Sequence, residues 1–193
     1  MSAKKCLLLL LLMLSKVLDN IGTFSQEQIL MLEKESRMCK FAKGDHLLKE
    51  GEIGDSIYLI LSGAAYQFKA DEITEMVIEL YTAGTWCFNA VSFSTMQPSL
   101  TSIVAYLPCS TLQLSVTTIH TLIGISPAFL QLGKILNDAV SRACYYDGAL
   151  SPSEKWRYLS KTRPDVVQHF PLKMIASYLK ITPETLSRVR SHK

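Results

Sequence analysis

The final residues of the chain carry charged and hydrogen-bonding side chains at a spacing that suits contact with DNA. Leu186 and Val189 lie three positions apart, so they would share one face of a helix and anchor it. Arginine can donate two hydrogen bonds to O6 and N7 of guanine, glutamate can accept one from N4 of cytosine, and serine or threonine can bind a base or a phosphate. The side chains expected on the opposite, outer face are Glu184, Thr185, Ser187, Arg188 and Arg190.

A second helix and a tight turn are predicted directly before this helix. Thr182 is a good N-cap, and Pro183 at the first helical position has no N–H to leave unsatisfied. Lys180 takes the turn position that often holds glycine, and a left-handed conformation there would cost on the order of 1 kcal/mol. The segment therefore predicts a helix-turn-helix, whose second helix enters the major groove with its outer face uncovered. The apolar positions expected to hold it together are Ile175, Ala176, Leu179 and Ile181.

Positive charge is concentrated in this part of the chain. Residues 171–193 hold five lysines and arginines against one glutamate, a net charge of 5 − 1 = +4, whereas the whole chain has +3, so the remainder sums to 3 − 4 = −1. Such concentration suits an anion-binding surface. We therefore expect Lys173 and Thr182 to join the outer face of the helix in binding double-stranded DNA. The alternative is a solvated amphipathic helix with ordinary surface arginines.

The central part of the chain predicts a roll of short antiparallel strands. Strand-like runs recur about every ten residues between glycine turns, which is typical of a sandwich, barrel or roll. Helices are expected before it, over residues 8–19 and 25–36, the second one capped by Ser25 and Gln28. The fold class is thus α+β, with an antiparallel β-roll of the jelly-roll type. The expected strands are 46–49, 56–61, 64–70, 74–80, 101–107 and 110–116.

A helical pattern over residues 126–150 follows the roll, and a Ser-Pro break at Ser151 then predicts a hinge. Ser151 or Ser153, followed by Glu154, predicts a capping box at the start of the next helix. Apolar residues recur at an average of 3.5 positions, the period of a seam between two packed helices. The seam could join two copies of the chain, or the helix could simply pack on its own roll. The expected domains are 1–125, 126–150 and 151–193. The seam residues are Leu132, Leu136, Ala139, Ala143, Tyr146 and Leu150.

Composition excludes several classes of protein. The five cysteines include no CxxC pair and no zinc-like spacing, and their odd number argues against a disulfide framework, so we expect reduced thiols, no metal site and a cytoplasmic protein. The run from Leu7 to Leu14 is too short to cross a bilayer. It is expected to pack against the domain as a helix, with a secretory signal as the alternative. No catalytic triad or paired carboxylates stand out, so no enzyme activity is expected.

The stretch FAKGDHLLKEGEIGDSIYLILSG, residues 41–63, resembles the opening of the cyclic-nucleotide-binding β-roll in the Crp/Fnr family of transcription regulators. The helix over 126–150 stands where that family has its dimerisation helix, and IASYLKITPETLSRVR is similar to its helix-turn-helix. The resemblance implies a homodimeric, sequence-specific DNA-binding regulator, with RNA polymerase as a further candidate partner. It also implies that Glu184 and Arg188 read bases. Pro183 replaces an arginine of the family, so the DNA sequence read should differ.

The same resemblance implies a degenerate effector pocket. Family members that bind cyclic AMP hold the ribose and phosphate with a Gly-Glu pair and an Arg-Ser or Arg-Thr pair, where this chain has Phe88-Asn89 and Ser99-Leu100. A buried phosphate needs a paired cation, and no lysine or arginine occurs between Lys69 and Lys134. Tight binding of cyclic AMP is therefore not expected, nor is any cofactor. The pocket could be collapsed, or it could hold an uncharged ligand. Its expected residues are Trp86, Phe88, Asn89, Ser99 and Thr101.

A ligand-binding sensory module whose last helices only pack on their own domain is the alternative function.

Overall fold

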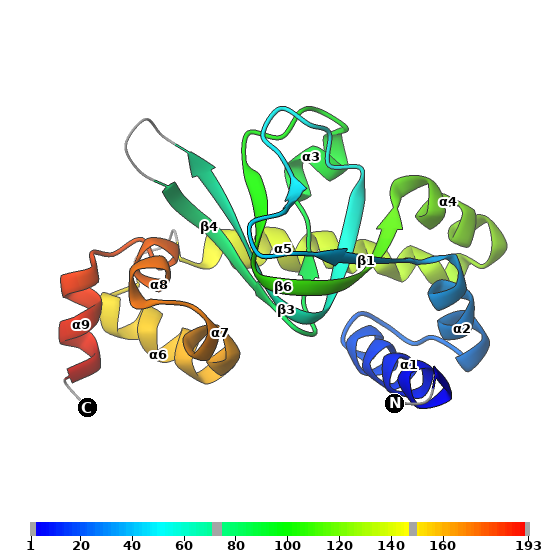
Figure 1. Ribbon diagram of the computed structural model, residues 1–193, viewed down its shortest axis with the longest axis horizontal. Coiled ribbons are helices and arrows are strands. Elements are labelled where there is room, and N and C mark those ends of the chain that lie inside the picture. The colour runs from blue at the N-terminus through cyan, green and yellow to red at the C-terminus, as the bar shows by residue number, and fades with distance from the viewer. Residues whose placement is uncertain (1–2, 71–74, 147–149, 192–193) are drawn as a thin grey trace.

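The computed structural model describes residues 3–70, 75–146 and 150–191, with the side chains of 3–7 and 140–145 outside the description. An antiparallel sheet forms the centre of the molecule, with the N-terminal helices at one end and a cluster of C-terminal helices at the other (Figure 1). The strand order is β1-β6-β3-β4, while β2 pairs with β6 and β5 pairs with β3. The strands are β1 Arg37–Phe41, β2 His46–Leu48, β3 Ser56–Ala70, β4 Glu75–Thr82, β5 Trp86–Cys87 and β6 Ser102–Ser115.

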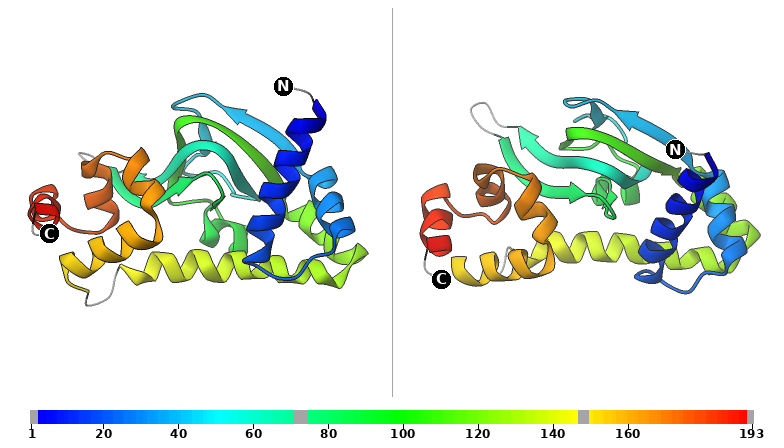
Figure 2. Two further views of the ribbon diagram at one scale, coloured as in Figure 1. Left: turned by 90° about the horizontal axis from the view of Figure 1, so that it is seen from below. Right: turned by 60° about the horizontal axis from the view of Figure 1, so that its bottom comes forward.

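Helices cover both ends of the sheet and run beneath it, where α5 joins the two ends (Figure 2). The predicted mixture of helices and an antiparallel roll is confirmed. Before and within the roll lie α1 Ala3–Asp19, α2 Gln26–Glu35 and α3 Ala90–Thr95; after it come α4 Val116–Ile125, the 3-10 helix η1 Pro127–Gly133 and α5 Lys134–Tyr145. The C-terminal cluster consists of α6 Pro152–Thr162, α7 Pro164–His169, α8 Leu172–Tyr178 and α9 Pro183–Ser191.

Two long strands replace four of the predicted short ones. The runs 56–61 and 64–70 form the single strand β3, and 101–107 and 110–116 form β6. The strands pair along this whole length, with irregular register around Ser62 and Ala64. Gly63 lies between these two residues at φ 89°, and a Cβ there would come within 2.1 Å of the Pro108 carbonyl oxygen. The glycine that suggested a turn is therefore a bend inside a continuous strand. Strands β1 and β5 were not predicted.

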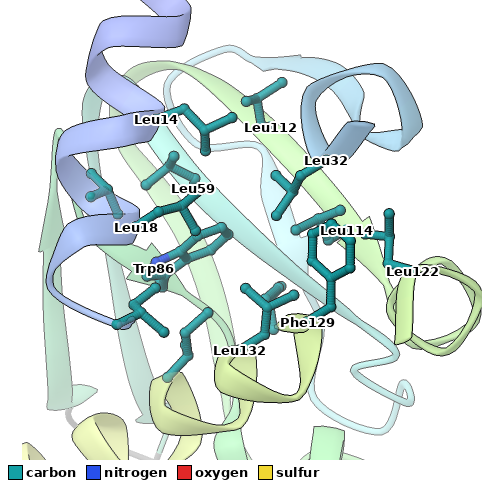
Figure 3. Packing of buried hydrophobic residues seen from close by; sticks show 14 of the residues in the cluster. Leu14, Leu18, Leu32, Leu59, Trp86, Leu112, Leu114, Leu122, Phe129 and Leu132 are labelled. Atoms are coloured by element: carbon teal, nitrogen blue, oxygen red, sulfur yellow. The ribbon is translucent and has the colours of Figure 1, made fainter. Parts of the chain in front are cut away.

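The N-terminal helices close one end of the main core. Leu14 and Leu18 of α1 are buried in the same core as Trp86 and Phe129, and Leu18 points toward Trp86 in Figure 3. The capping box predicted at the start of α2 is present, since the Ser25 hydroxyl accepts from the Gln28 N–H. The described part of α1 thus packs on the domain. Within the described residues, no helix combines the length and apolar character needed to cross a membrane.

Part of the predicted seam is buried in its own subunit. Leu132 lies in the main core, Leu136 and Ala139 are half-buried against it, and Tyr146 is buried against Tyr178 of the C-terminal cluster. Leu132 and Tyr146 are therefore buried within their own subunit, and a seam between two copies through the remaining positions stays a prediction. An apolar stripe of period 3.5 can equally bury against its own domain, which is what α5 does along the sheet. The side chain of Ala143 lies outside the described residues.

The C-terminal cluster has a core of its own that continues onto the roll. Leu159, Val166, Ile175 and Leu186 have no exposed surface, and they join a cluster that includes Leu80 of β4. The capping box predicted before α6 is present, because Ser151 and Glu154 exchange hydrogen bonds. The last helices are thus held by burial and capping, not by charge alone.

Candidate nucleic-acid interface and effector pocket

The predicted helix-turn-helix is present as α8 and α9. The N–H of Thr185 donates to Oγ1 of Thr182 at 3.2 Å, so Thr182 is the N-cap that the sequence indicated. Leu186 is fully buried and Val189 half-buried, which fixes the inner face of α9. The turn residue Lys180 has φ 56°, so it adopts the left-handed conformation that glycine takes more easily.

A buried lysine that sequence reasoning missed holds the end of α8. Nζ of Lys155 donates to the carbonyl oxygen of Leu179 at 3.0 Å, and only 7% of Lys155 is exposed. The carbonyls at a helix C-terminus lack partners within the helix and carry partial negative charge, so an ammonium group is favourable there. Lys155 therefore stabilises the turn between α8 and α9, and so the orientation of α9. Its position in α6, 24 residues from Leu179, gave no local signal.

The exposed face of α9 carries Glu184, Ser187 and Arg188. The pKa of Glu184 lies below its usual value, because its own backbone N–H and the Thr182 hydroxyl donate to the carboxylate, and Arg188 adds positive charge. The carboxylate is therefore ionised at neutral pH and can only accept hydrogen bonds. An ionised acceptor beside a guanidinium donor, four positions apart on one helix, suits the edges of a cytosine and a guanine.

Arg190 and Thr185 were both expected on the outer face of the last helix, and the structure places both elsewhere. The guanidinium carbon of Arg190 lies 5.5 Å from the centre of the Trp156 ring in α6, a cation–π contact that ties this side chain to its own subunit. Thr185 is half-buried, and its hydroxyl is 3.0 Å from that of Thr182. The helical period puts Arg190 about 200° away from Arg188, and so off the outer face.

Lys173 lies on α8 rather than on α9. It lines a cleft of about 610 Å³ between the β3–β4 hairpin and the C-terminal helices, together with Lys69 and Glu75. Its side chain is exposed.

The effector pocket of the roll is small. A cleft of about 180 Å³ includes only Phe88 and Asn89 of the five predicted residues. Trp86 is buried in the main core instead. Tyr58, which was not predicted, also lines the cleft, and burial raises its pKa to about 12, with smaller contributions from Cys39 and Asp55. No lysine or arginine is among the described residues that line this cleft.

The polar groups behind the cleft are already bonded to one another. Nδ2 of Asn89 donates to Oγ of Ser99 and to Oγ1 of Thr101, each at 2.8 Å. Gln67 donates to the same Thr101 oxygen at 2.8 Å, and the Tyr81 hydroxyl donates to Gln67 at 2.9 Å. These side chains need no ligand to complete their hydrogen bonds. The family resemblance predicted Asn89, Ser99 and Thr101 as neighbours in one pocket. Gln67 on β3 and Tyr81 on β4 were not predicted, because only the folded sheet brings them to this pocket.

No described group of histidines, cysteines and carboxylates could hold a metal ion. Cys39, Cys87 and Cys109 are free thiols, and burial holds the pKa of Cys87 well above its usual value. The side chains of Cys6 and Cys144 lie outside the described residues.

Comparison with known families matches residues 38–125 to the cyclic nucleotide-binding domain. Residues 38–125 are therefore similar in sequence to this domain. The matched residues run from β1 to α4, so they include the small cleft and its bonded polar groups but not the helix-turn-helix. No curated protein matches the chain in sequence.

Solved structures extend the likeness to the C-terminal helices. FixK2 from Bradyrhizobium japonicum matches with a TM-score of 0.63 and 15% identity, over 81% of this chain and 83% of that one. The catabolite activator protein of Thermus thermophilus matches with a TM-score of 0.57 and 19% identity, over 89% and 84%. A cyclic nucleotide-binding domain from Methylobacillus flagellatus KT matches with a TM-score of 0.62 and 23% identity, over 69% and 80%. The chain therefore has the fold of the Crp/Fnr regulators, as the resemblance implied, and its structural neighbours are regulators and binding domains rather than enzymes.

Proposed function

We propose that the chain is a homodimeric, sequence-specific DNA-binding transcription regulator whose cyclic nucleotide-binding domain holds no cyclic nucleotide. The observation that carries the proposal is the recognition helix α9. It is capped by Thr182, anchored by Leu186, and presents Glu184 and Arg188 to solvent. RNA polymerase is a further candidate partner, because a regulator of this fold acts on transcription.

The loss of cyclic nucleotide binding is supported by the chemistry of the roll. A bound cyclic phosphate would need a cation in the pocket, and Asn89 and Ser99 stand there instead, bonded to each other. Breaking that bond to admit a phosphate would expose buried polar groups without supplying a positive charge.

Dimer formation has support from an apolar surface beside α5. Leu130 is 63% exposed and Ile125 56% exposed. Leu130 lines an apolar cleft of about 230 Å³ together with Ile123 and Leu136. Exposed apolar patches of this kind commonly mark interfaces between proteins. We propose that a second copy covers this surface, so that two α9 helices face one operator.

Selection from a random pool of double-stranded DNA by the purified protein tests the proposal. We expect enrichment of a palindrome whose half-sites lie about 10 bp apart, or a multiple of that distance. Light scattering should give twice the 21.6 kDa mass of the chain. Enrichment of no sequence, both by the protein alone and with cell extract added, would contradict DNA reading. A rise in thermal stability with cyclic AMP in that case would favour the sensory module.

A further inference from the structure

A buried ion pair joins the roll to the C-terminal helices. Nη1 of Arg163 lies 2.8 Å from Oε1 of Glu79 on β4, and the two side chains are only 14% and 8% exposed. Arg163 stands between α6 and α7, 84 positions from Glu79 in the sequence. The contact thus connects two separate parts of the fold, and water has little access to it.

The Arg163 guanidinium is held at several points, not by the carboxylate alone. It also donates to the hydroxyl of Tyr178 on α8 at 3.2 Å and to the backbone carbonyl of Leu80 on β4. Burial opposes its charge, but Glu79 and the other partners outweigh this and raise the pKa of Arg163 above its usual value. A planar group fixed by two elements in this way defines an orientation as well as a distance.

Neighbouring contacts fix the same two surfaces. The N–H of Val77 on β4 donates to Oγ of Ser177 on α8 at 2.9 Å, and Thr82 donates to Asp165 of α7. The rings of Tyr106 on β6 and Phe170 lie 5.0 Å apart. Figure 2 shows the C-terminal helices placed against the β3–β4 end of the sheet.

The position of the recognition helix α9 depends on how α8 packs on β4. Leu186 of α9 packs in the same core as Ile175 and Tyr178 of α8, and Tyr178 is the residue that contacts Arg163. A tilt of α8 on β4 would therefore move α9 as well. In a dimer held together through the roll and α5, the distance between the two recognition helices depends on the angle of each on its own roll.

We infer that Glu79 and Arg163 are positioning residues that set the half-site spacing of the operator. This inference rests on the proposed function. One added base pair moves a half-site by about 3.4 Å and turns it by roughly 35°, so a rigid pair of helices rejects it. Helices held less rigidly on β4 can follow the displaced half-site. Loss of the ion pair thus relaxes spacing while the base contacts of α9 stay intact.

The test uses the full-length protein and the operator obtained by selection. Anisotropy titrations compare the native spacing, spacings with one base pair added or removed, and an isolated half-site. Wild type should prefer the native spacing by about tenfold, the equivalent of 1.4 kcal/mol. Glu79→Ala should bring that preference to near unity and leave half-site affinity unchanged. If Glu79 only stabilises the fold, Glu79→Ala should lower the affinities for the full operator and for the half-site together, and the preference for the native spacing should stay at its wild-type value.

Glu50→Ala is the control, since Glu50 is an exposed carboxylate of the roll that is not among the residues lining the clefts beside the C-terminal helices. It should keep the wild-type preference. If Glu79→Ala does not fold by circular dichroism, Ser177→Ala carries the test, because it removes a neutral contact of the same interface. An unchanged spacing preference in the folded variant overturns the inference and leaves DNA binding standing. Absence of any DNA binding by wild type removes both proposals.

Discussion

Two arginines on one helix have different surroundings. Arg188 is exposed beside Glu184, whereas Arg190 lies over Trp156. The sequence predicted the types and spacing of these arginines, but not that they make different contacts. Trp156 lies 34 positions before Arg190 and contacts it only after α6 and α9 pack together. At the effector pocket, likewise, the absence of a cation was evident in the sequence, while the bonds from Gln67 and Tyr81 required the paired strands.

Arg190→Ala should therefore lower stability more than DNA selectivity. We expect a loss of about 0.5–1 kcal/mol in the free energy of unfolding, the usual strength of an exposed cation–π contact. Urea unfolding measures the loss, and the sequence preference of the variant should match wild type. A variant that is fully stable but has lost its preference for the operator would place Arg190 at the DNA instead.

Cyclic AMP should leave the melting temperature unchanged, even at concentrations far above those that saturate a binding protein. A ligand raises the melting temperature only if it binds the folded state, and Asn89, Ser99 and Thr101 are already bonded to one another. Thermal shift with a panel of cyclic nucleotides measures this. A clear, concentration-dependent rise with cyclic AMP would show that the network opens to admit it.

At the scale of helices and strands, the sequence predicted those features that depend on only a few neighbouring residues. The caps at Ser25, Ser151 and Thr182 all follow from a few neighbouring residues. The continuity of β3 could not be predicted, because Gly63 at a bend looks the same in the sequence as a glycine in a turn. The face on which α5 buries its apolar stripe depends on the rest of the fold in the same way.

Thr182→Ala should loosen the start of α9. It removes the hydroxyl that accepts from the Thr185 N–H, a change that typically costs about 1 kcal/mol. Hydrogen exchange at the first amides of α9 should become faster, and operator affinity should fall with it. Thr182→Ser, which keeps the hydroxyl, should behave as wild type. Equal exchange rates in the alanine variant would mean that the cap contributes nothing.

The capping box of α6 should give a small pH dependence. Hydrogen bonds from Ser151 lower the pKa of Glu154 below its usual value. A carboxyl with a lowered folded-state pKa adds stability above its unfolded pKa, and this is lost as pH falls through the folded value. The difference in melting temperature between wild type and Glu154→Gln should therefore be present at neutral pH and vanish in acid. A difference that grows in acid would contradict this assignment.

At the scale of the whole molecule, the fold class and the order of its parts were predictable, and the joint between them was not. Glu79 and Arg163 look like ordinary surface charges in the sequence, yet they form the buried contact between roll and C-terminal helices.

Ionic strength should weaken operator binding steeply, because lysines and arginines that contact phosphates release counterions. A titration series in increasing salt measures the slope, and a flat response would exclude a DNA-backbone contact.

The central claim is that α9 reads bases through Arg188. Its most direct measurement is an anisotropy titration of the selected operator with Arg188→Ala, beside Arg37→Ala as a control for the loss of an exposed arginine on the roll. Arg188→Ala should weaken specific binding by about 1–3 kcal/mol and relax the preference at one base pair of each half-site, with Arg37→Ala unchanged. An Arg188→Ala protein that binds the operator with wild-type affinity and the same base preference would contradict the claim.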